Sequence, residues 1–275
     1  MEIYYKNSKG KKIYLDRFPY IVLDEATLFD SEWDYQANEA STQIIKFSKK
    51  MKTKDADINI SGSTKEEYYK NVSMLVSVFD TDIISAEPGE LHVGEYYLPC
   101  YFYKNIKSGN FRNVKKSTIT FSVVAENDQW IKETCIVFRP GTVHEAGQNL
   151  DYPHDYPYDY ANGLSSQKLV NDSISTCDFE MIIYGTCANP NIRIGDNQYN
   201  VDCVVDTGEY LVINSKKRKV YKKKIDGEIE NCFYLRNREY YIFEKIPTGN
   251  LTVVWNGLFG FDITLSAERS EPEWT

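Results

Sequence analysis

The chain has 275 residues, with 32 Lys and Arg against 40 Asp and Glu, which gives a formal net charge of −8. Its hydrophobic fraction of 42% and charged fraction of 26% are close to the globular average, and they exclude a disordered, collagen-like or coiled-coil chain. No stretch approaches the roughly 18 to 20 apolar residues of a membrane-spanning helix. Residues 1–7 have neither the basic head nor the apolar core of a signal sequence. We therefore expect one or two soluble domains that are made in the cytoplasm and have no membrane partner.

Metal and cofactor sites have little support in the sequence. The six cysteines are dispersed without a C-x-x-C pair and there are only three histidines, so the clustered ligands of a structural zinc site are missing. His154 lies between Asp151 and Asp155, but this proline-rich surrounding favours a solvated loop over a preorganised metal site. We expect no metal, no cofactor, and thiols that are buried in a reducing compartment.

Aromatic residues make up 14% of the chain, and most of them are interleaved with Ile, Val and Thr, which favour strands. The sequence therefore predicts a mainly β fold with one α-helix. In the N-terminal half, strands are expected at residues 12–15, 20–23, 42–47, 56–60, 96–103, 117–124 and 130–138.

One segment has a helical pattern. Apolar residues recur at i, i+4, i+7, i+8 and i+11 from Tyr68 to Phe79, which is the stripe of an amphipathic helix. Ser63 and Glu66 have the spacing of a capping box at its start. The pattern predicts a helix over residues 63–79 that packs on a sheet.

Two adjacent strand patterns, residues 117–125 and 129–138, are joined by the turn-rich tripeptide Glu126-Asn127-Asp128. This combination is typical of a β-hairpin. We therefore expect a long hairpin over residues 117–138.

A domain boundary is predicted after this hairpin. Residues 151–163 combine Asp, Tyr and Pro, which prevents a helix and favours an extended linker. The linker would separate an N-terminal β domain, residues 1–150, from a second domain, residues 164–275. Recurrent turn signals indicate an antiparallel sandwich in the second domain. Its strands are expected at residues 178–184, 199–205, 210–213, 219–222, 240–243, 251–255 and 261–265.

Catalytic patterns are weak throughout the chain. Paired acids such as Asp80 and Asp82 are frequent, but glycoside hydrolysis requires two carboxylates across a cleft, which sequence proximity does not supply. The chain also lacks a Gly-x-Ser-x-Gly elbow, a phosphate loop and a His-Glu-x-x-His motif. We expect no enzyme, and a wall-degrading hydrolase is the third hypothesis.

Residues 216–224 contain seven basic residues in nine, which suggests nucleic-acid binding. Without these seven, the chain has 25 − 40 = −15, and lysines on an edge strand also serve to block edge pairing. We favour a solvated strand without specific nucleic-acid binding, and contact with an acidic partner stays open. Trp255 and Tyr210 could stack on sugar rings. A carbohydrate-binding module acting in host cell-surface recognition is therefore the alternative function.

Several segments, taken in order, resemble the distal tail proteins of long-tailed phages with flexible tails. The resemblance spans the chain and rests on the order and spacing of loose motifs. These motifs are Trp33-Asp34-Tyr35, Phe79-Asp80-Thr81-Asp82, Pro88-Gly89-Glu90-Leu91, Tyr97-Leu98-Pro99-Cys100-Tyr101, a Tyr-Pro-Tyr-Asp-Tyr linker and the closing Ser270-Glu271-Pro272-Glu273-Trp274.

The resemblance implies a structural component of the virion tail tip that is assembled in the host bacterial cytoplasm. Its N-terminal β domain would form a hexameric ring, with a galectin-like β-sandwich as the C-terminal domain on the outside of the ring. The implied partners are further copies of the chain, the tail tube protein, the tail-associated tip protein and receptor-binding proteins.

A closed ring requires one patch of each subunit to meet a different patch on the next subunit. The predicted hairpin would supply backbone hydrogen bonds and apolar area at that contact. The candidate subunit-interface residues are Trp130, Ile131, Ile136 and Phe138. Packing in the core of their own domain would account for them almost equally well.

Overall fold

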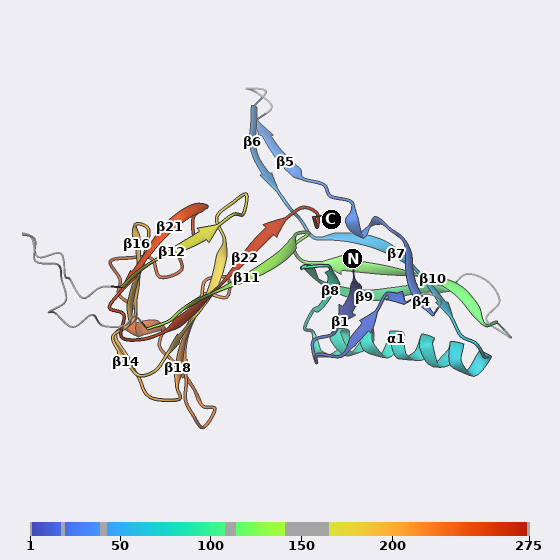
Figure 1. Cartoon of the computed structure of the whole chain (residues 1–275). Coiled ribbons are helices and arrows are strands. Elements are labelled where there is room, and N and C mark those ends of the chain that lie inside the picture. Colours follow the sequence, from blue (N-terminus) through green and yellow to red (C-terminus); the bar gives the residue numbers. More distant parts are fainter. Residues whose placement is uncertain (1, 18–19, 39–42, 108–113, 141–164, 274–275) are drawn as a thin grey trace, which may run out of the picture. The chain divides into compact units, whose positions relative to one another are not determined.

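The computed structural model describes residues 2–17, 20–38, 43–107, 114–140 and 165–273. The chain forms two compact units. The first unit comprises Met1–Lys132 and Glu268–Thr275, and the second comprises Glu133–Ala267. Within the described residues, both units are built of strands and the first also contains an α-helix (Figure 1), so the predicted mainly β class with one helix is confirmed.

The first unit is an antiparallel β structure with one long helix. Its elements are β1 (Ile3–Lys6), β2 (Lys12–Tyr14), β3 (Asp16–Arg17), β4 (Ile21–Ala26), the short 3-10 helix η1 (Thr27–Phe29), β5 (Asp34–Asn38), β6 (Gln43–Ser48), β7 (Lys52–Ser61), α1 (Lys65–Ser85), β8 (Gly89–Val93), β9 (Tyr96–Lys107), β10 (Lys116–Ala125) and the start of β11 (Trp130–Phe138).

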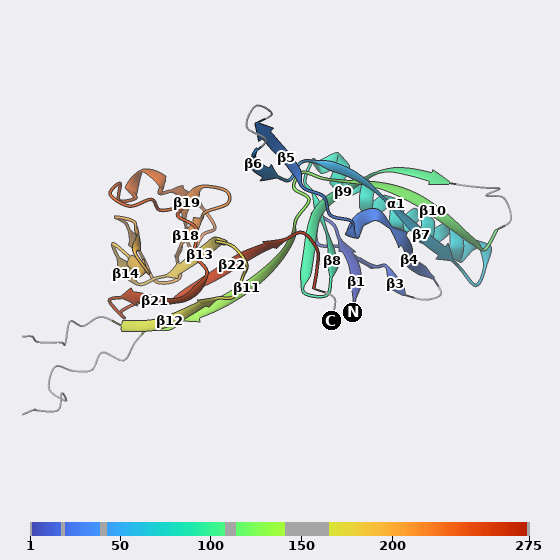
Figure 2. The same ribbon diagram turned by 90° about the horizontal axis from the view of Figure 1, so that it is seen from above.

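The strands of this unit are ordered β3-β4-β7-β10-β9, and β9 continues through β8 and β1 to β2. Helix α1 lies along one face of the sheet (Figures 1 and 2) and contacts β7 and β9. Between them, Phe79 of the helix stacks on Phe102 at 4.1 Å, and Tyr5 meets Phe79 edge-on at 5.0 Å. These aromatic side chains form the core that the alternating pattern predicts.

The helix is shifted and longer than its apolar stripe indicates. Thr64 caps its start, because its Oγ1 accepts a hydrogen bond from the Glu67 N–H, whereas the sequence indicated Ser63. The helix passes residue 79 because Asp82, a polar residue on the buried face, accepts hydrogen bonds from the Tyr5 hydroxyl at 2.6 Å and the Ser8 N–H at 2.7 Å. Asp82 thus extends the buried face of the helix through hydrogen bonds, which a search for hydrophobic periodicity does not detect.

The predicted hairpin over residues 117–138 is wrong. Strands β10 and β11 both pair with β9 and both run antiparallel to it, so the chain does not reverse between them. Val124 is opposite Tyr101 and Ile131 is opposite Tyr97, so residues 126–129 form an excursion between two strands that run in the same direction. Asp128 of this excursion is held by ion pairs to lysines from the start of β7 and from the residue after β6, and the local turn composition therefore does not produce a reversal.

The described part of the second unit contains two larger antiparallel sheets and the two-stranded sheet β14-β17. Its elements are the end of β11, β12 (Ser165–Asn171), β13 (Asp178–Tyr184), β14 (Cys187–Ala188), β15 (Asn191–Ile194), β16 (Asn197–Asn200), β17 (Val204–Val205), β18 (Tyr210–Asn214), β19 (Lys219–Lys223), β20 (Ile229–Asn231), the 3-10 helix η2 (Phe233–Leu235), β21 (Gly249–Trp255) and most of β22 (Phe261–Arg269).

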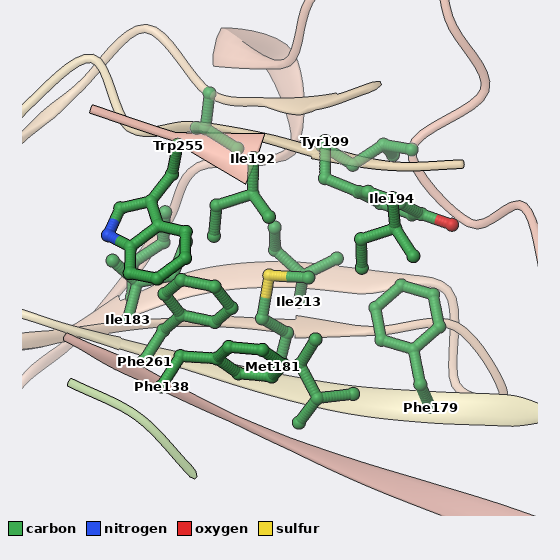
Figure 3. Packing of buried hydrophobic residues seen from close by; sticks show 14 of the residues in the cluster. Phe138, Phe179, Met181, Ile183, Ile192, Ile194, Tyr199, Ile213, Trp255 and Phe261 are labelled. Carbon is green, nitrogen blue, oxygen red and sulfur yellow. The ribbon is translucent and has the colours of Figure 1, made fainter. Parts of the chain in front are cut away.

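One of the two larger sheets of the second unit has the order β20-β19-β18-β13-β22 and the other has the order β12-β21-β15-β16. Apolar side chains from both sheets meet between them (Figure 3), among them Met181, Ile213 and Ile192. Phe138 stacks on Phe261 at 4.7 Å, and Trp255 meets Phe261 edge-on at 5.3 Å. This is the sandwich packing that the strand pattern predicts.

Some local expectations for the second unit differ from the structure. Residues 240–243 form a bend and a turn instead of a strand, and Ile242 and Phe243 of this segment are buried. The pattern at 199–205 is divided between β16 and β17.

The boundary between the units differs from the expected domains 1–150 and 164–275. It lies within β11, after Lys132, and the chain returns to the first unit at Glu268. The predicted linker, residues 151–163, lies outside the described residues. The change of core occurs inside one continuous strand, in which Trp130 and Phe138 belong to different cores.

Candidate functional site

The four residues predicted for a subunit interface lie mostly inside the two units. Trp130 is fully buried and stacks on Phe29 at 5.8 Å in the first unit. Ile131 is buried and opposite Tyr97 in the sheet. Phe138 is buried in the second unit, and Ile136 is partly buried against the same core. Trp130 is 0% exposed and Phe138 is 1% exposed, so packing in the core of their own unit, the alternative for these residues, accounts for their large apolar side chains.

A different segment presents apolar side chains to solvent. Strands β5 and β6 pair only with each other among the described strands and form a two-stranded ribbon that extends away from the sheet of the first unit (Figures 1 and 2). We call β5, β6 and their flanking residues the ribbon. Its large exposed side chains are Trp33, Tyr35, Ile44, Ile45, Phe47 and Met51.

The register of the ribbon sorts these side chains by face. Tyr35 is directly opposite Phe47, with 6.5 Å between ring centroids, and Ala37 is opposite Ile44. The pairing shifts by one residue between Gln36 and Ala37, which places Ile44 on the same face as Phe47, and the other face carries the opposing polar pair Gln36 and Lys46. The ribbon thus has the amphipathic pattern of a strand pair that covers a core, although Tyr35 is 65% exposed and Phe47 is 54% exposed.

The base of the ribbon is anchored by charged side chains. Asp128 is 1% exposed, and its carboxylate lies 2.5 Å from the Lys54 ammonium and 3.9 Å from the Lys49 ammonium. Lys49 directly follows β6, and its ammonium also lies 5.0 Å from the centroid of the Trp33 ring. Burial lowers the pKa of Lys49, and the nearby Asp128 opposes that shift. The ion pairs connect the end of the ribbon that follows β6 to the excursion between β10 and β11, and the contact of Lys49 with Trp33 links the end that precedes β5.

Two outer contacts continue this anchoring. Lys50 pairs with Asp34, the first residue of β5, at 3.5 Å, and Lys52 pairs with Glu32. The Ser31 hydroxyl also donates a hydrogen bond at 3.2 Å to Glu271, which lies in the part of the first unit that follows β22. The strands of the ribbon are therefore held at their base, while their apolar face is uncovered in the single chain.

Sequence reasoning identified the strand at 42–47 and the Trp33 motif, but it did not identify the ribbon as the exposed element. The signal was present in the alternation around Tyr35 and Phe47. An alternating pattern shows that a face is apolar, and it does not show whether the same chain covers that face.

Other kinds of site find no support in the described part of the chain. No group of three or more His, Cys, Asp or Glu side chains there could hold a metal ion. Of the six cysteines, which are all free, only Cys135 is exposed. The one helix among the described residues that is long enough to cross a membrane is not apolar enough to do so.

Comparison with known proteins defines the class of fold. No protein-family model and no curated protein sequence matches the chain. Solved structures do match it along nearly its whole length, and they are hub and baseplate proteins of phages. The chain therefore has the fold of phage distal tail hub proteins, and the resemblance inferred from the sequence is confirmed at this level.

Three solved structures illustrate the likeness. The crystal structure of SPP1 Dit (gp 19.1), described as a paradigm of the hub adsorption apparatus in phages that infect Gram-positive bacteria, has 9% identity and a TM-score of 0.61, with 98% of each chain covered. The phage P2 baseplate in its activated conformation with Ca has 14% identity and a TM-score of 0.62, with 98% of this chain and 99% of that chain covered. The same baseplate with Sr has 13% identity, a TM-score of 0.62 and the same coverage.

Proposed function

We propose that the protein is a structural hub of a phage or prophage tail tip, and that its copies assemble into a hexameric ring. The fold shared with phage hub proteins supports the hub role. The single observation that carries the assembly proposal is the ribbon, whose apolar face is exposed in the isolated chain.

The ribbon has a physical reason to seek a partner surface. A two-stranded hairpin is marginally stable in water unless its apolar face is covered. Exposed apolar patches of this kind typically mark protein contacts. Since the ribbon is one patch and the surface that would receive it is another, the contact is heterologous and can repeat from subunit to subunit until a ring closes.

The remaining roles follow from the same proposal. One side of the ring meets the tail tube protein and the other meets the tail-associated tip protein. The second unit, proposed to be galectin-like, anchors receptor-binding proteins at the periphery. The hub performs no chemical reaction, and its place of action is the tail tip of the virion.

Native mass spectrometry and negative-stain electron microscopy of the purified full chain test this proposal. We expect six copies per particle and a ring in projection. A chain that stays monomeric at concentrations of about tens of micromolar would contradict it.

A further inference from the structure

We propose that the second unit contains a binding site for a negatively charged saccharide, in a groove bordered by the β18–β19 turn, η2 and residues 236–243. This site is separate from the ribbon and goes beyond the hub role. It uses the segment at 240–243 that was expected to be a strand and instead forms a turn.

The groove has the size of a small-ligand site. It consists of two adjoining hollows of about 590 and 610 Å³, and both are lined by Arg218 and Phe233. Each hollow by itself lies within the range of about 300 to 1,000 Å³ that is typical of ligand sites. A concave surface of this size fits a few sugar units better than it fits the broad face of a globular partner.

The charge of the groove is opposite to that of the chain. Five cationic side chains line it, against the two carboxylates of Glu180 and Glu239, whereas the whole chain has a net charge of −8. The cations are Lys217, Arg218, Lys219, Arg236 and Arg238.

These cations also differ from the other members of the basic segment 216–224. Lys222 is paired with Glu209 and Glu230, and Lys224 is paired with Glu228 at 2.9 Å. Within the described ranges, no carboxylate forms an ion pair with any of the five groove cations. Lys222 and Lys224 are therefore neutralised by carboxylates, whereas Lys217, Arg218 and Lys219, at the turn and the first residue of β19, line the groove without an ion pair.

Aromatic side chains in the groove favour a saccharide over a small inorganic anion, because they can stack on a sugar ring. The Arg236 guanidinium lies 3.9 Å from the centroid of the Phe233 ring and donates a hydrogen bond to the Phe233 carbonyl oxygen, which fixes its position. Phe233 stacks on Phe243 at 6.1 Å, and Tyr241 meets Phe243 edge-on at 5.9 Å. Tyr241 is 51% exposed, so its ring offers a face for stacking.

Amide side chains complete the set. Asn231 and Asn237 line the hollows, and their side-chain oxygens accept hydrogen bonds from the N–H groups of Phe233 and Glu239, which leaves their amide nitrogens to donate to sugar hydroxyls. Guanidinium groups bind phosphate or carboxylate in a bidentate manner. A saccharide that carries phosphate or carboxylate groups uses all three kinds of side chain, whereas a long nucleic acid would extend beyond the groove over an acidic chain.

The test uses the full chain on an array of phosphorylated and carboxylated oligosaccharides, printed beside their neutral counterparts, single-stranded oligonucleotides and poly-aspartate. Arg218→Asn/Arg238→Gln removes two groove cations, and Asn tolerates the left-handed backbone of Arg218, with φ of 51°. Lys223→Gln/Lys224→Gln removes the same charge from the end of β19 and the residue after it, which do not line the groove. Tyr241→Ala removes the exposed ring.

We expect binding to anionic oligosaccharides, with dissociation constants at least about tenfold lower than those of the neutral counterparts. Arg218→Asn/Arg238→Gln and Tyr241→Ala should each weaken it by about tenfold, and Lys223→Gln/Lys224→Gln should leave it within about twofold. The proposal is overturned if no anionic saccharide binds, if neutral saccharides bind equally, or if oligonucleotides or poly-aspartate bind as tightly. Equal losses in both charge variants would also overturn it, because they would indicate unspecific attraction. Ring assembly is measured separately, so either proposal can fail without the other.

Discussion

The ribbon provides the most direct test of how copies of this chain meet. Tyr35→Ser/Phe47→Ser removes both aromatic rings from its apolar face, on which Tyr35 is 65% exposed and Phe47 is 54% exposed. An aromatic side chain can bury about 150 to 250 Å², so each ring has roughly 80 to 160 Å² left to cover. At about 25 cal/mol/Å² that area corresponds to about 2 to 4 kcal/mol per ring if it is completely covered.

Binding recovers only part of such a transfer free energy, because association also orders side chains. For the two rings together the complete transfer free energy is about 4 to 8 kcal/mol, and we take half of its low value and half of its middle value. The double variant should therefore weaken each contact between subunits by about 2 to 3 kcal/mol, which raises the dissociation constant roughly 30-fold to 150-fold. Sedimentation velocity over a concentration series measures this shift. The single chain should keep its fold, since neither ring contributes to the core of the first unit.

Gln36→Ser/Lys46→Ser is the matched control, because it changes the opposing pair on the polar face of the same ribbon. It should assemble at nearly the concentration of the unaltered chain. Assembly of Tyr35→Ser/Phe47→Ser at an unshifted concentration would refute the reasoning from the exposed face.

Three further predictions concern the first unit. Asp128→Ala leaves two lysines without their buried counter-charge. It should reduce the free energy of unfolding, measured in denaturant, by about 3 kcal/mol or more. A loss below about 1 kcal/mol would show that the ion pairs do not anchor the ribbon. A hydrogen bond from His92 is the main reason why the pKa of Glu90 falls to about 2 from its ordinary 4.5, so Glu90 stabilises the fold above that ordinary value and the contribution disappears as pH falls from about 4.5 to 2. Glu90→Gln should flatten the decrease in melting temperature over this pH range, and an unchanged slope would contradict the assignment. A Cβ at Gly89 would lie 2.1 Å from the Tyr5 hydroxyl oxygen, so Gly89→Ala should cost about 1 to 3 kcal/mol of stability in thermal unfolding, and an unaltered midpoint would show that Tyr5 moves aside freely.

Much of the architecture could be predicted from local pattern. The strand expected at 178–184 is β13 with the same limits, and the strand expected at 130–138 is β11. Strand β13 has an alternating burial pattern and pairs with β18 and β22 of its own unit, so period-2 alternation was enough to locate it.

The errors arose where residues distant in sequence decide a local structure. The reversal expected at residues 126–128 does not occur, and Asp128 there is paired with Lys54, a residue of β7. The helix continues beyond residue 79 because Asp82 is bound by Tyr5 from the other end of the unit. Neither the Asp128–Lys54 pair nor the Asp82–Tyr5 hydrogen bond can be inferred from the composition of the segment whose structure it changes.

The candidate sites also could not be placed from the sequence alone, because their surroundings come from distant residues. Trp130 and Phe138 were correctly recognised as large apolar side chains in a strand, but the sequence does not distinguish a core from an interface. The basic run at 216–224 was visible at once. Its division into paired and unpaired cations depends on the carboxylates of Glu209, Glu228 and Glu230, which only the folded sheet brings to it.

The return of the chain to the first unit after β22 affects the order in which the molecule can mature during synthesis. Arg269 and Glu273 contact the hydroxyl of Tyr96, and Glu271 reaches Ser31 next to the ribbon. The ribosome makes these residues only after the whole second unit, so a nascent first unit lacks the brace at the base of its ribbon until then. Subunits therefore complete the region that holds their exposed strands late in translation, which delays premature association between unfinished chains.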